Sequence, residues 1–266
     1  MRAEEQGNPV DESKSEENEE GRQGLEYFNT VDQLRIKEHA DVDKVLSRSE
    51  SERRYSVKDG SGQTVYNAIE DLNCSAGSSG GNCQGFAMRI LDGRDAEVMR
   101  IFRPLVSGAD RLQNRSFQSC MGKCRYYRTK NTFRVVIDSI NQLPCTLQRL
   151  EVFAPPDQLI GKVEQEQSLL VPKFQIMDSE GKRVARIKGP ISTLSIFGSV
   201  KFQAKSEGGK AIGAIKKEWS GLFKEVLTDA DHYGLTFSPE LDVNVKALVF
   251  AAAFLIDFMF FSKRAI

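Results

Sequence analysis

The most distinctive hydrophobic pattern in this sequence lies at its C-terminal end. Residues 247–256 carry no polar side chain, and a single Asp257 separates them from the aromatic-rich stretch 258–261. A helix that is apolar on every face must be buried on every face, either in protein or in lipid. A helix over 247–261 would be roughly 22 Å long, which is short of the ~30 Å hydrocarbon core of a bilayer. The length favours a buried core helix over 243–261, and a membrane span stays open as the alternative. The helix positions that we single out are Ala247, Phe250, Phe254, Asp257 and Phe258.

Between residues 55 and 215 the chain alternates apolar and polar residues, and short turns rich in Asp, Gly and Ser interrupt the alternation. This pattern is typical of β-hairpins with one buried face. Three segments share a plan in which an Asp stands six residues before a Val, starting at Asp59, Asp92 and Asp178. Two looser copies cover 150–163 and 200–215. Five hairpins supply about ten strands.

A sheet of this size usually curls, splits or closes to remove its edges. A closed barrel of this size has a wide lumen that must be filled, and the hydrophobic helix has the right diameter and chemistry to fill it. We therefore predict a mainly β fold, a closed antiparallel barrel of about 12 strands around a central C-terminal helix.

Other segments break the strand pattern. Residues 1–24 hold eight Asp or Glu and few apolar side chains, so we predict a disordered acidic tail before a domain at 25–266. Residues 106–143 are irregular and basic, which indicates a long surface loop. Residues 216–227 place apolar side chains at helical spacing from Trp219 onward, which predicts an amphipathic helix.

Composition narrows the function. With 40% hydrophobic and 28% charged residues the chain can build a core. Its 37 basic and 37 acidic residues give a formal net charge of zero, so charge predicts no nucleic-acid partner. The odd count of five cysteines and the lack of an N-terminal signal peptide favour a reducing, cytosolic compartment. With two histidines and neither a nucleophile elbow nor a phosphate loop, covalent or metal-assisted catalysis has no evident residues.

A set of short motifs resembles the phospholipid scramblase family over roughly residues 25–261. The motifs are Leu25-Glu26-Tyr27, Val65-Tyr66-Asn67-Ala68-Ile69-Glu70-Asp71, Arg103-Pro104-Leu105, Pro172-Lys173-Phe174, Ile187-Lys188-Gly189-Pro190, Asp229-Ala230-Asp231 and the apolar stretch 254–261. The resemblance implies a tubby-like fold, a barrel around a central hydrophobic helix. It also implies calcium-activated, ATP-independent movement of phospholipids between leaflets, at the cytosolic face of the plasma membrane. A phospholipid membrane is the implied partner, and a homo-oligomer stays open.

The segment that the family uses as its calcium site corresponds here to residues 229–240. Two carboxylates, a glycine at the sixth place and Glu240 at the twelfth resemble an EF-hand loop, although Tyr233 breaks the pattern. The predicted Ca²⁺-binding residues are Asp229, Asp231, Tyr233, Gly234 and Glu240. The alternative is a loop that caps the preceding helix and opens a strand at 235–237.

Family members typically carry a thioacylated cysteine run, of which only Cys145 remains here. Cys120 and Cys124 lie in the basic region and are substitute candidates for lipidation. One acyl chain gives only marginal membrane attachment, and unmodified thiols are the alternative. Two lysines within 213–219, a segment that some relatives use for nuclear import, fit a solvated strand end better.

The rival function is a non-catalytic tubby-like module that binds phosphoinositide or protein partners in signalling or transcription. In that reading the binding residues are basic positions on the barrel, namely Lys173, Lys182, Arg183, Arg186 and Lys188. Whether the protein counts as an enzyme depends on which function holds, because phospholipid scrambling requires no covalent catalysis.

Overall fold

The structure is a computed structural model, and a little over half of the chain can be described in it. The described residues are 24–39, 52–71, 86–104, 147–154, 157–168, 171–191, 199–218 and 232–261.

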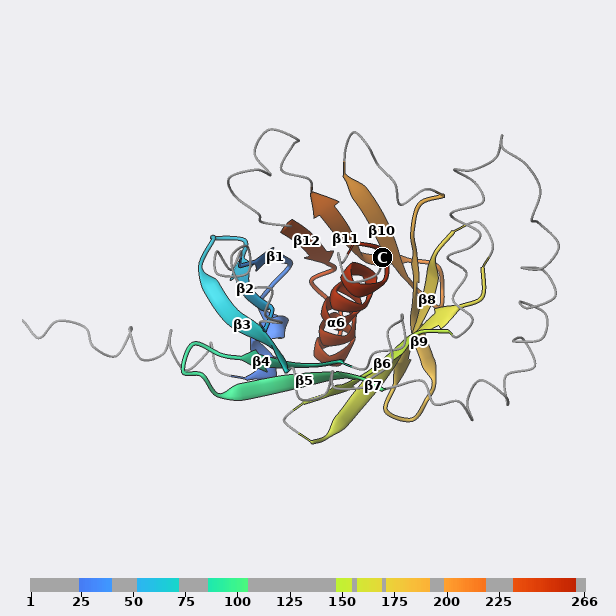
Figure 1. Cartoon of the computed structure of the whole chain (residues 1–266). Helices are drawn as coiled ribbons and strands as arrows, with labels where there is room; N and C mark the ends of the chain where they lie inside the picture. Colours follow the sequence, from blue (N-terminus) through green and yellow to red (C-terminus); the bar gives the residue numbers. More distant parts are fainter. Residues whose placement is uncertain are drawn as a thin grey trace, which may run out of the picture.

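Twelve antiparallel strands close into a barrel, and one long helix lies inside it (Figure 1). The strands are β1 (Gln33–Glu38), β2 (Arg54–Asp59), β3 (Thr64–Asp71), β4 (Phe86–Leu91), β5 (Glu97–Arg103), β6 (Arg149–Phe153), β7 (Leu159–Glu166), β8 (Lys173–Asp178), β9 (Arg183–Lys188), β10 (Val200–Ser206), β11 (Ala211–Glu218) and β12 (His232–Phe237). A short 3-10 helix, η1 (Leu25–Asn29), precedes them, and the helix α6 (Val243–Phe260) follows. Each strand pairs with its sequence neighbours, and β1 closes the barrel by pairing with β12. The predicted closed barrel around a C-terminal helix is confirmed.

All five predicted hairpins are present, as the pairs β2–β3, β4–β5, β6–β7, β8–β9 and β10–β11. The aspartate that three of them share shapes the turn. The Oδ1 atom of Asp59 accepts hydrogen bonds from the backbone N–H groups two and four residues later, at 2.9 and 3.0 Å. Asp92 and Asp178 repeat both contacts in their own turns. A short carboxylate that bonds local N–H groups is a common turn stabiliser, and it explains the repeated spacing.

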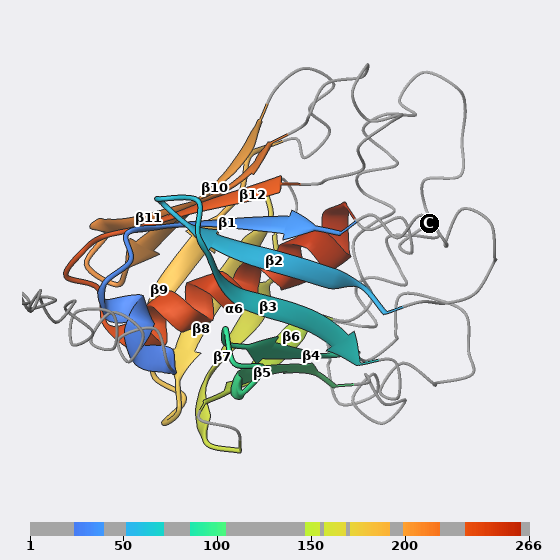
Figure 2. The ribbon, with the colours of Figure 1, turned by 90° about the vertical axis from the view of Figure 1, so that its left-hand side faces the viewer.

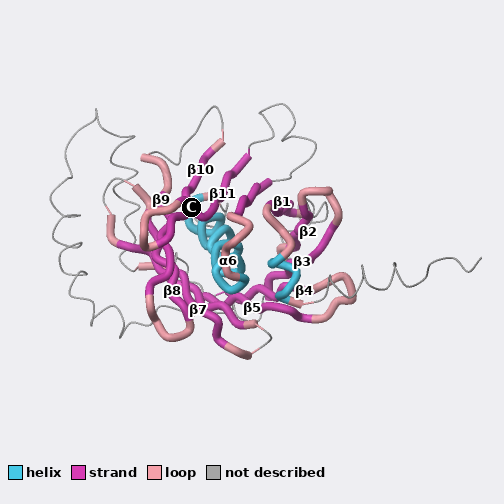
Figure 3. The backbone as a smooth tube through the Cα atoms, turned by 180° about the vertical axis from the view of Figure 1, so that it is seen from behind, coloured by secondary structure: helices cyan, strands magenta, loops and turns pink. Residues whose placement is uncertain are grey.

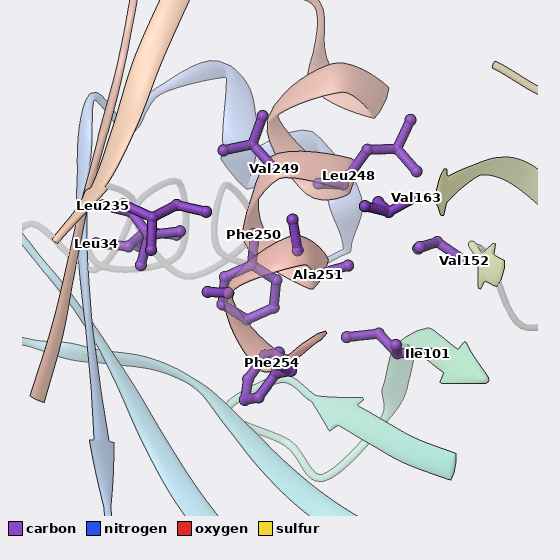
Figure 4. Close-up of a cluster of buried hydrophobic side chains, with 14 of the residues drawn as sticks. Leu34, Ile101, Val152, Val163, Leu235, Leu248, Val249, Phe250, Ala251 and Phe254 are labelled. Carbon is purple, nitrogen blue, oxygen red and sulfur yellow. The ribbon is translucent and has the colours of Figure 1, made fainter. Parts of the chain in front are cut away.

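The helix α6 begins at an ordinary cap and runs along the barrel axis (Figures 2 and 3). The carboxylate of Asp242 accepts hydrogen bonds from the N–H groups of Asn244 and Val245, which satisfies two donors of the first turn. Every residue from 246 to 257 is buried. Around α6 the inward side chains of the strands form one continuous core (Figure 4). Within this core the rings of Phe250 and Phe254 pack edge to face, with 5.2 Å between their centroids.

Close packing of helix against wall requires a glycine at one point. A Cβ atom at Gly161 in β7 would lie 2.8 Å from Leu248 Cδ1 on the helix, and it would also meet the backbone carbonyl of Met177 in β8. The missing side chain therefore lets α6 approach the β7–β8 wall.

One expectation needs correction. Residues 216–218, predicted as the start of an amphipathic helix, form the end of strand β11, because β11 stays paired with β10 up to Lys217 and with β12 up to Glu218. The rest of that predicted helix, the acidic tail up to residue 23 and the predicted loop at 106–143 lie outside the described residues.

Candidate functional site

The central helix is the candidate functional element that the structure places most clearly. It is long and apolar enough to pass for a membrane span by composition, yet 67% of its residues are buried inside the barrel. The five helix residues predicted from the sequence are all in place: Ala247, Phe250, Phe254 and Asp257 are buried, and Phe258 is half-buried. Each end of the helix carries one buried charge, Lys246 near its start and Asp257 near its end.

Asp257 lies in a buried cluster of charged and phenolic side chains from four strands and from Arg53, the residue before β2. We call the following residues the Asp257 cluster: Arg53, Tyr55, Glu70, Lys217, Tyr233 and Asp257. The Tyr233 hydroxyl donates to Asp257 Oδ1 at 2.5 Å, and Lys217 Nζ lies 3.8 Å from the same oxygen. The Lys217 ammonium also donates to the Tyr233 hydroxyl at 3.1 Å. One face of the carboxylate is thus held by β11 and β12.

The other face of the carboxylate points to β2 and β3. Arg53 Nη1 donates to Asp257 Oδ2 at 3.3 Å, and Arg53 Nε donates to Glu70 at 2.9 Å. The Tyr55 hydroxyl lies 3.5 Å from Asp257 Oδ2. Two cations and two anions face one another, so the cluster is formally neutral. Such balance is the usual condition for keeping charges buried.

Burial and neighbouring charge shift the proton affinities in this cluster. Burial alone would lower the pKa of Arg53, but Tyr55, Glu70 and Asp257 act against it and hold that pKa above its ordinary value. The pKa of Tyr55 is raised well above 10.0 by burial and by the negative charge of Asp257. Both shifts keep Arg53 charged and Tyr55 neutral at any physiological pH.

The opposite end of the helix is held by a lysine. The side chain of Lys246 is fully buried, and its Nζ donates to the backbone carbonyls of Phe28 and Val31, each at 2.9 Å. Burial lowers the pKa of Lys246 below 10.5. Phe28 also packs against Phe250, at 5.7 Å between ring centroids. The chain around η1 therefore closes one end of the barrel over the start of α6 (Figure 2).

Another buried cation lies beside the end of the helix. Arg103 in β5 is 1% exposed, and its Nε donates to Gln148 Oε1 at 3.0 Å. Its guanidinium lies 4.1 Å from the ring centroid of Phe258. Stacking of arginine on an aromatic ring stabilises the pair and gives Phe258 a fixed neighbour.

Comparison with known proteins identifies the family of this barrel. The Scramblase family model matches residues 13–134 and 127–263. The chain belongs to the scramblase family. It is 36% identical to phospholipid scramblase 2 of cattle over 90% of its own length and 71% of the relative's. It is 35% identical to human phospholipid scramblase 1 and 32% identical to human phospholipid scramblase family member 5, again over 90% of this chain, and covers 66% and 77% of those proteins. No solved structure matches significantly.

The predicted calcium loop of this scramblase is only partly visible. Asp229 and Asp231 lie outside the described residues. Tyr233 and Gly234 are paired in β12, and Glu240 follows the other end of that strand, where it pairs with Lys210 at 3.4 Å. A six-residue strand spans roughly 16 Å, so the structure does not bring Glu240 together with Tyr233. Among the residues that the structure describes, no group of three His, Cys, Asp or Glu side chains could hold a metal ion. The visible donors therefore do not form a calcium site by themselves.

The cysteines considered for lipidation cannot be placed, since Cys120, Cys124 and Cys145 lie outside the described residues. They stay predictions of the sequence.

Sequence reasoning missed several buried charged residues near the end of α6, although a signal for them existed. Glu70, Arg103 and Lys217 each stand at an inward position of an alternating strand, two residues after a buried Ala68, Ile101 or Ile215. Strand alternation alone would have placed these charges inside the scramblase barrel. The expectation of a solvated strand end at 213–219 is wrong for Lys217, which is 1% exposed.

Proposed function

We propose that this chain moves phospholipids between the two leaflets of the plasma membrane, activated by calcium and independent of ATP, while associated with the cytosolic face. Membership of the scramblase family carries this proposal. The enclosed apolar helix is the feature of the fold that fits it, because its composition would also suit lipid.

We place the lipid path outside the barrel. A phospholipid headgroup needs a polar route through hydrocarbon. The lumen offers none, because the side chains of Phe250, Ala251 and their neighbours fill it (Figure 4). Withdrawal of the helix would strand Arg53 and Lys217 in the wall without Asp257, which is costly for buried charges. Scrambling in this proposal deforms the bilayer beside an intact barrel.

For calcium, the residues that would supply carboxylate oxygens are Asp229 and Asp231. Asp231 is followed directly by β12, and Tyr233 of β12 donates to Asp257 on the helix. This short connection is the reason to test the loop. Affinity in the weak range, on the order of 10⁻⁴–10⁻³ M, is expected for so few carboxylates.

The decisive experiment is reconstitution of the full chain into liposomes that carry a fluorescent phospholipid in both leaflets. Addition of a membrane-impermeant quencher bleaches only the outer leaflet unless lipids exchange. Calcium-dependent loss of the protected fraction supports the proposal. Complete protection, together with binding to anionic liposomes, would instead support the non-catalytic binding module. The Asp229→Ala/Asp231→Ala variant tests calcium separately, since heats of calcium binding identical to wild type would exclude this loop.

Membrane attachment through Cys145, Cys120 or Cys124 forms a separate part of the proposal. Metabolic labelling with an alkyne fatty acid, followed by hydroxylamine treatment, detects a thioester-linked acyl chain. Labelling that is as strong in the triple Cys→Ser variant as in wild type would exclude these three residues.

A further inference from the structure

The barrel wall formed by β10, β11, β12, β1 and β2 carries a straight row of cations on its outer face. These strands are consecutive neighbours in the closed sheet, and Figure 2 shows them one after another. The pairing register aligns one residue from each strand, and we call the following residues the basic row: Lys201, Lys216, Gly234, Arg35 and Lys58. Lys201, Lys216 and Arg35 are exposed, and Lys58 is half-exposed. At about 4.8 Å between neighbouring strands, the row is roughly 19 Å wide.

The two ends of the basic row are pairs of like charge. Lys201 lies directly opposite Lys216, and Arg35 lies directly opposite Lys58. Like charges at directly opposed positions destabilise a sheet. A segment that carries several negative charges across all five strands would relieve both pairs at once.

Acidic side chains near the basic row offset only part of this charge. Glu218 pairs with Lys216 at 2.9 Å. Asp59 follows Lys58, but its carboxylate accepts hydrogen bonds within its own turn and from η1. Glu38 lies at the far end of β1, three residues from the row. Among the residues that the structure describes, no other cation of the basic row forms an ion pair, so most of its charge is available to a ligand.

A glycine lies at the centre of the basic row. Gly234 of β12 is flanked by Lys216 on one side and by Arg35 on the other. A Cβ atom on Gly234 would meet no atom of the described residues within 4 Å, so the space over this part of the backbone is open. Glycine inside a strand often marks a place where another backbone or a ligand approaches closely. The centre of the row is therefore open to an acidic polypeptide segment.

The chain itself contains such a segment beside this wall. Residues 11–20 hold six Asp or Glu and one lysine. They precede Gly24, whose carbonyl accepts a 2.8 Å hydrogen bond from Tyr66 in β3. Tyr66 lies opposite Val57, the residue before Lys58, so the chain enters the described structure beside the Lys58 end of the row. At up to about 3.3 Å per residue, residues 11–23 reach about 43 Å from Gly24, which exceeds the width of the row.

We propose that residues 11–20 lie across the basic row of the same chain and form ion pairs with its lysines and its arginine. Charge complementarity selects this occupant. Attachment to the barrel raises the effective concentration of the segment to the order of mM, so weak exposed ion pairs suffice to hold it. An external anionic partner would have to displace the segment, which thereby regulates access to this face. The contact is independent of the proposed function, because it involves neither lipid nor calcium.

Zero-length crosslinking of the full chain tests the contact. A carbodiimide joins a carboxylate to a lysine amine as an amide, with loss of water, when the two groups touch, and mass spectrometry locates the bond. Crosslinks from residues 11–20 should concentrate on the three lysines of the basic row. Lys182 and Lys188, exposed on the β8–β9 hairpin, are the internal controls, and the row should exceed them by roughly fivefold or more. The yield should fall in about 1 M salt, where the Debye length is about 3 Å.

A charge reversal in the basic row tests the role of charge and keeps every lysine as a reporter. In Arg35→Glu the crosslinks to Lys201 and Lys216 should fall by roughly fivefold. The matched control Arg89→Glu, at an exposed position on β4, should leave them at the wild-type yield. Crosslinks spread equally over the basic row and the control lysines, or equal yields in the two variants, would overturn the proposal.

A mixture of unlabelled and isotope-labelled chains shows whose segment is bound. Crosslinks within chains of one label support the proposal, whereas mixed crosslinks would assign the row to a second copy and overturn it.

The reaction of the row lysines with a soluble acylating reagent gives an independent readout. It should rise several-fold in the variant Glu16→Gln/Glu17→Gln/Glu19→Gln/Glu20→Gln and stay constant at Lys182. Unchanged reactivity of the row lysines in this variant would also overturn the proposal, because the segment would then not cover them.

Discussion

The Tyr233 hydroxyl of β12 donates a 2.5 Å hydrogen bond to the Asp257 carboxylate of α6. This contact joins the last strand of the barrel to the end of the helix that the barrel encloses. Lys217 of β11 contacts both groups. Strands β11 and β12 and helix α6 therefore share one buried polar network.

The first prediction concerns the charge of Asp257. Replacement by leucine removes the anion that Lys217 and Arg53 face, so the free energy of unfolding should fall by roughly 3–5 kcal/mol. Urea denaturation followed by circular dichroism measures the change. The double variant Asp257→Leu/Lys217→Met should recover part of the loss, because it also removes the stranded ammonium. A single variant as stable as wild type would show that Asp257 does not anchor the helix.

The second prediction concerns Lys246 at the other end of the helix. Lys246→Met keeps the length of the side chain but leaves the carbonyls of Phe28 and Val31 without their donor, so we expect a loss of roughly 1–3 kcal/mol in unfolding free energy. The matched control is Lys201→Met at an exposed position of β10, which should change stability by less than about 0.5 kcal/mol. A more stable Lys246→Met protein would contradict the barrel contacts and would favour a lipid environment, where the buried charge is a cost.

Much of the fold could be predicted because patterns within short stretches of the sequence indicate its elements. The alternation of apolar residues and the repeated Asp59, Asp92 and Asp178 turns define the hairpins without reference to the rest of the chain. The uninterrupted apolar stretch at 247–256 indicates that the helix is buried. Closure of the barrel followed from the number of strands and the need to cover their edges.

The candidate site could not be predicted in the same way, because its contacts join distant residues. Arg53 and Asp257 are 204 residues apart, and only the closed barrel brings them together. The EF-hand resemblance depends on the order of oxygen-bearing residues along the chain and takes no account of their secondary structure. Gly234 and Glu240 are separated along the chain by the remainder of β12, so a sequence pattern could not show their separation in space.

The third prediction concerns the closest approach of helix and wall. Gly161→Ala places a methyl group against Leu248 and the Met177 carbonyl, so it should destabilise the protein by roughly 1–3 kcal/mol. The control Gly93→Ala should be nearly neutral, because a Cβ atom there meets nothing within 4 Å. Adding Leu248→Ala should not restore stability, since the backbone carbonyl of Met177 stays in place. Thermal unfolding of the variants checks the predicted order of their stabilities. Equal melting temperatures for Gly161→Ala and Gly93→Ala would contradict the close contact between α6 and the β7–β8 wall.

The fourth prediction concerns stability at alkaline pH. Burial raises the pKa of both Tyr55 and Tyr66 above 10.0, so the folded protein keeps these phenol protons at a pH where the unfolded chain releases them. A raised pKa in the folded state stabilises fully below pH 10 and loses its contribution as the pH rises further. Lys246 acts in the opposite sense, because its pKa is lowered by burial, but its contribution levels off as the pH rises past 10.5, where the unfolded lysine also loses its proton.

Above pH 10.5 the free energy of unfolding should therefore fall by up to roughly 1.4 kcal/mol per pH unit for each tyrosine. Tyr55→Phe and Tyr66→Phe should each reduce that slope, and the double variant should reduce it most. Tyr66→Phe also loses a 2.8 Å hydrogen bond to the Gly24 carbonyl. Its free energy of unfolding at pH 7 should therefore drop by about 1 kcal/mol, while the fall of that free energy with rising alkaline pH becomes less steep. Urea titrations at several pH values separate the two effects. A double variant with the alkaline slope of wild type would show that other groups control unfolding in this range.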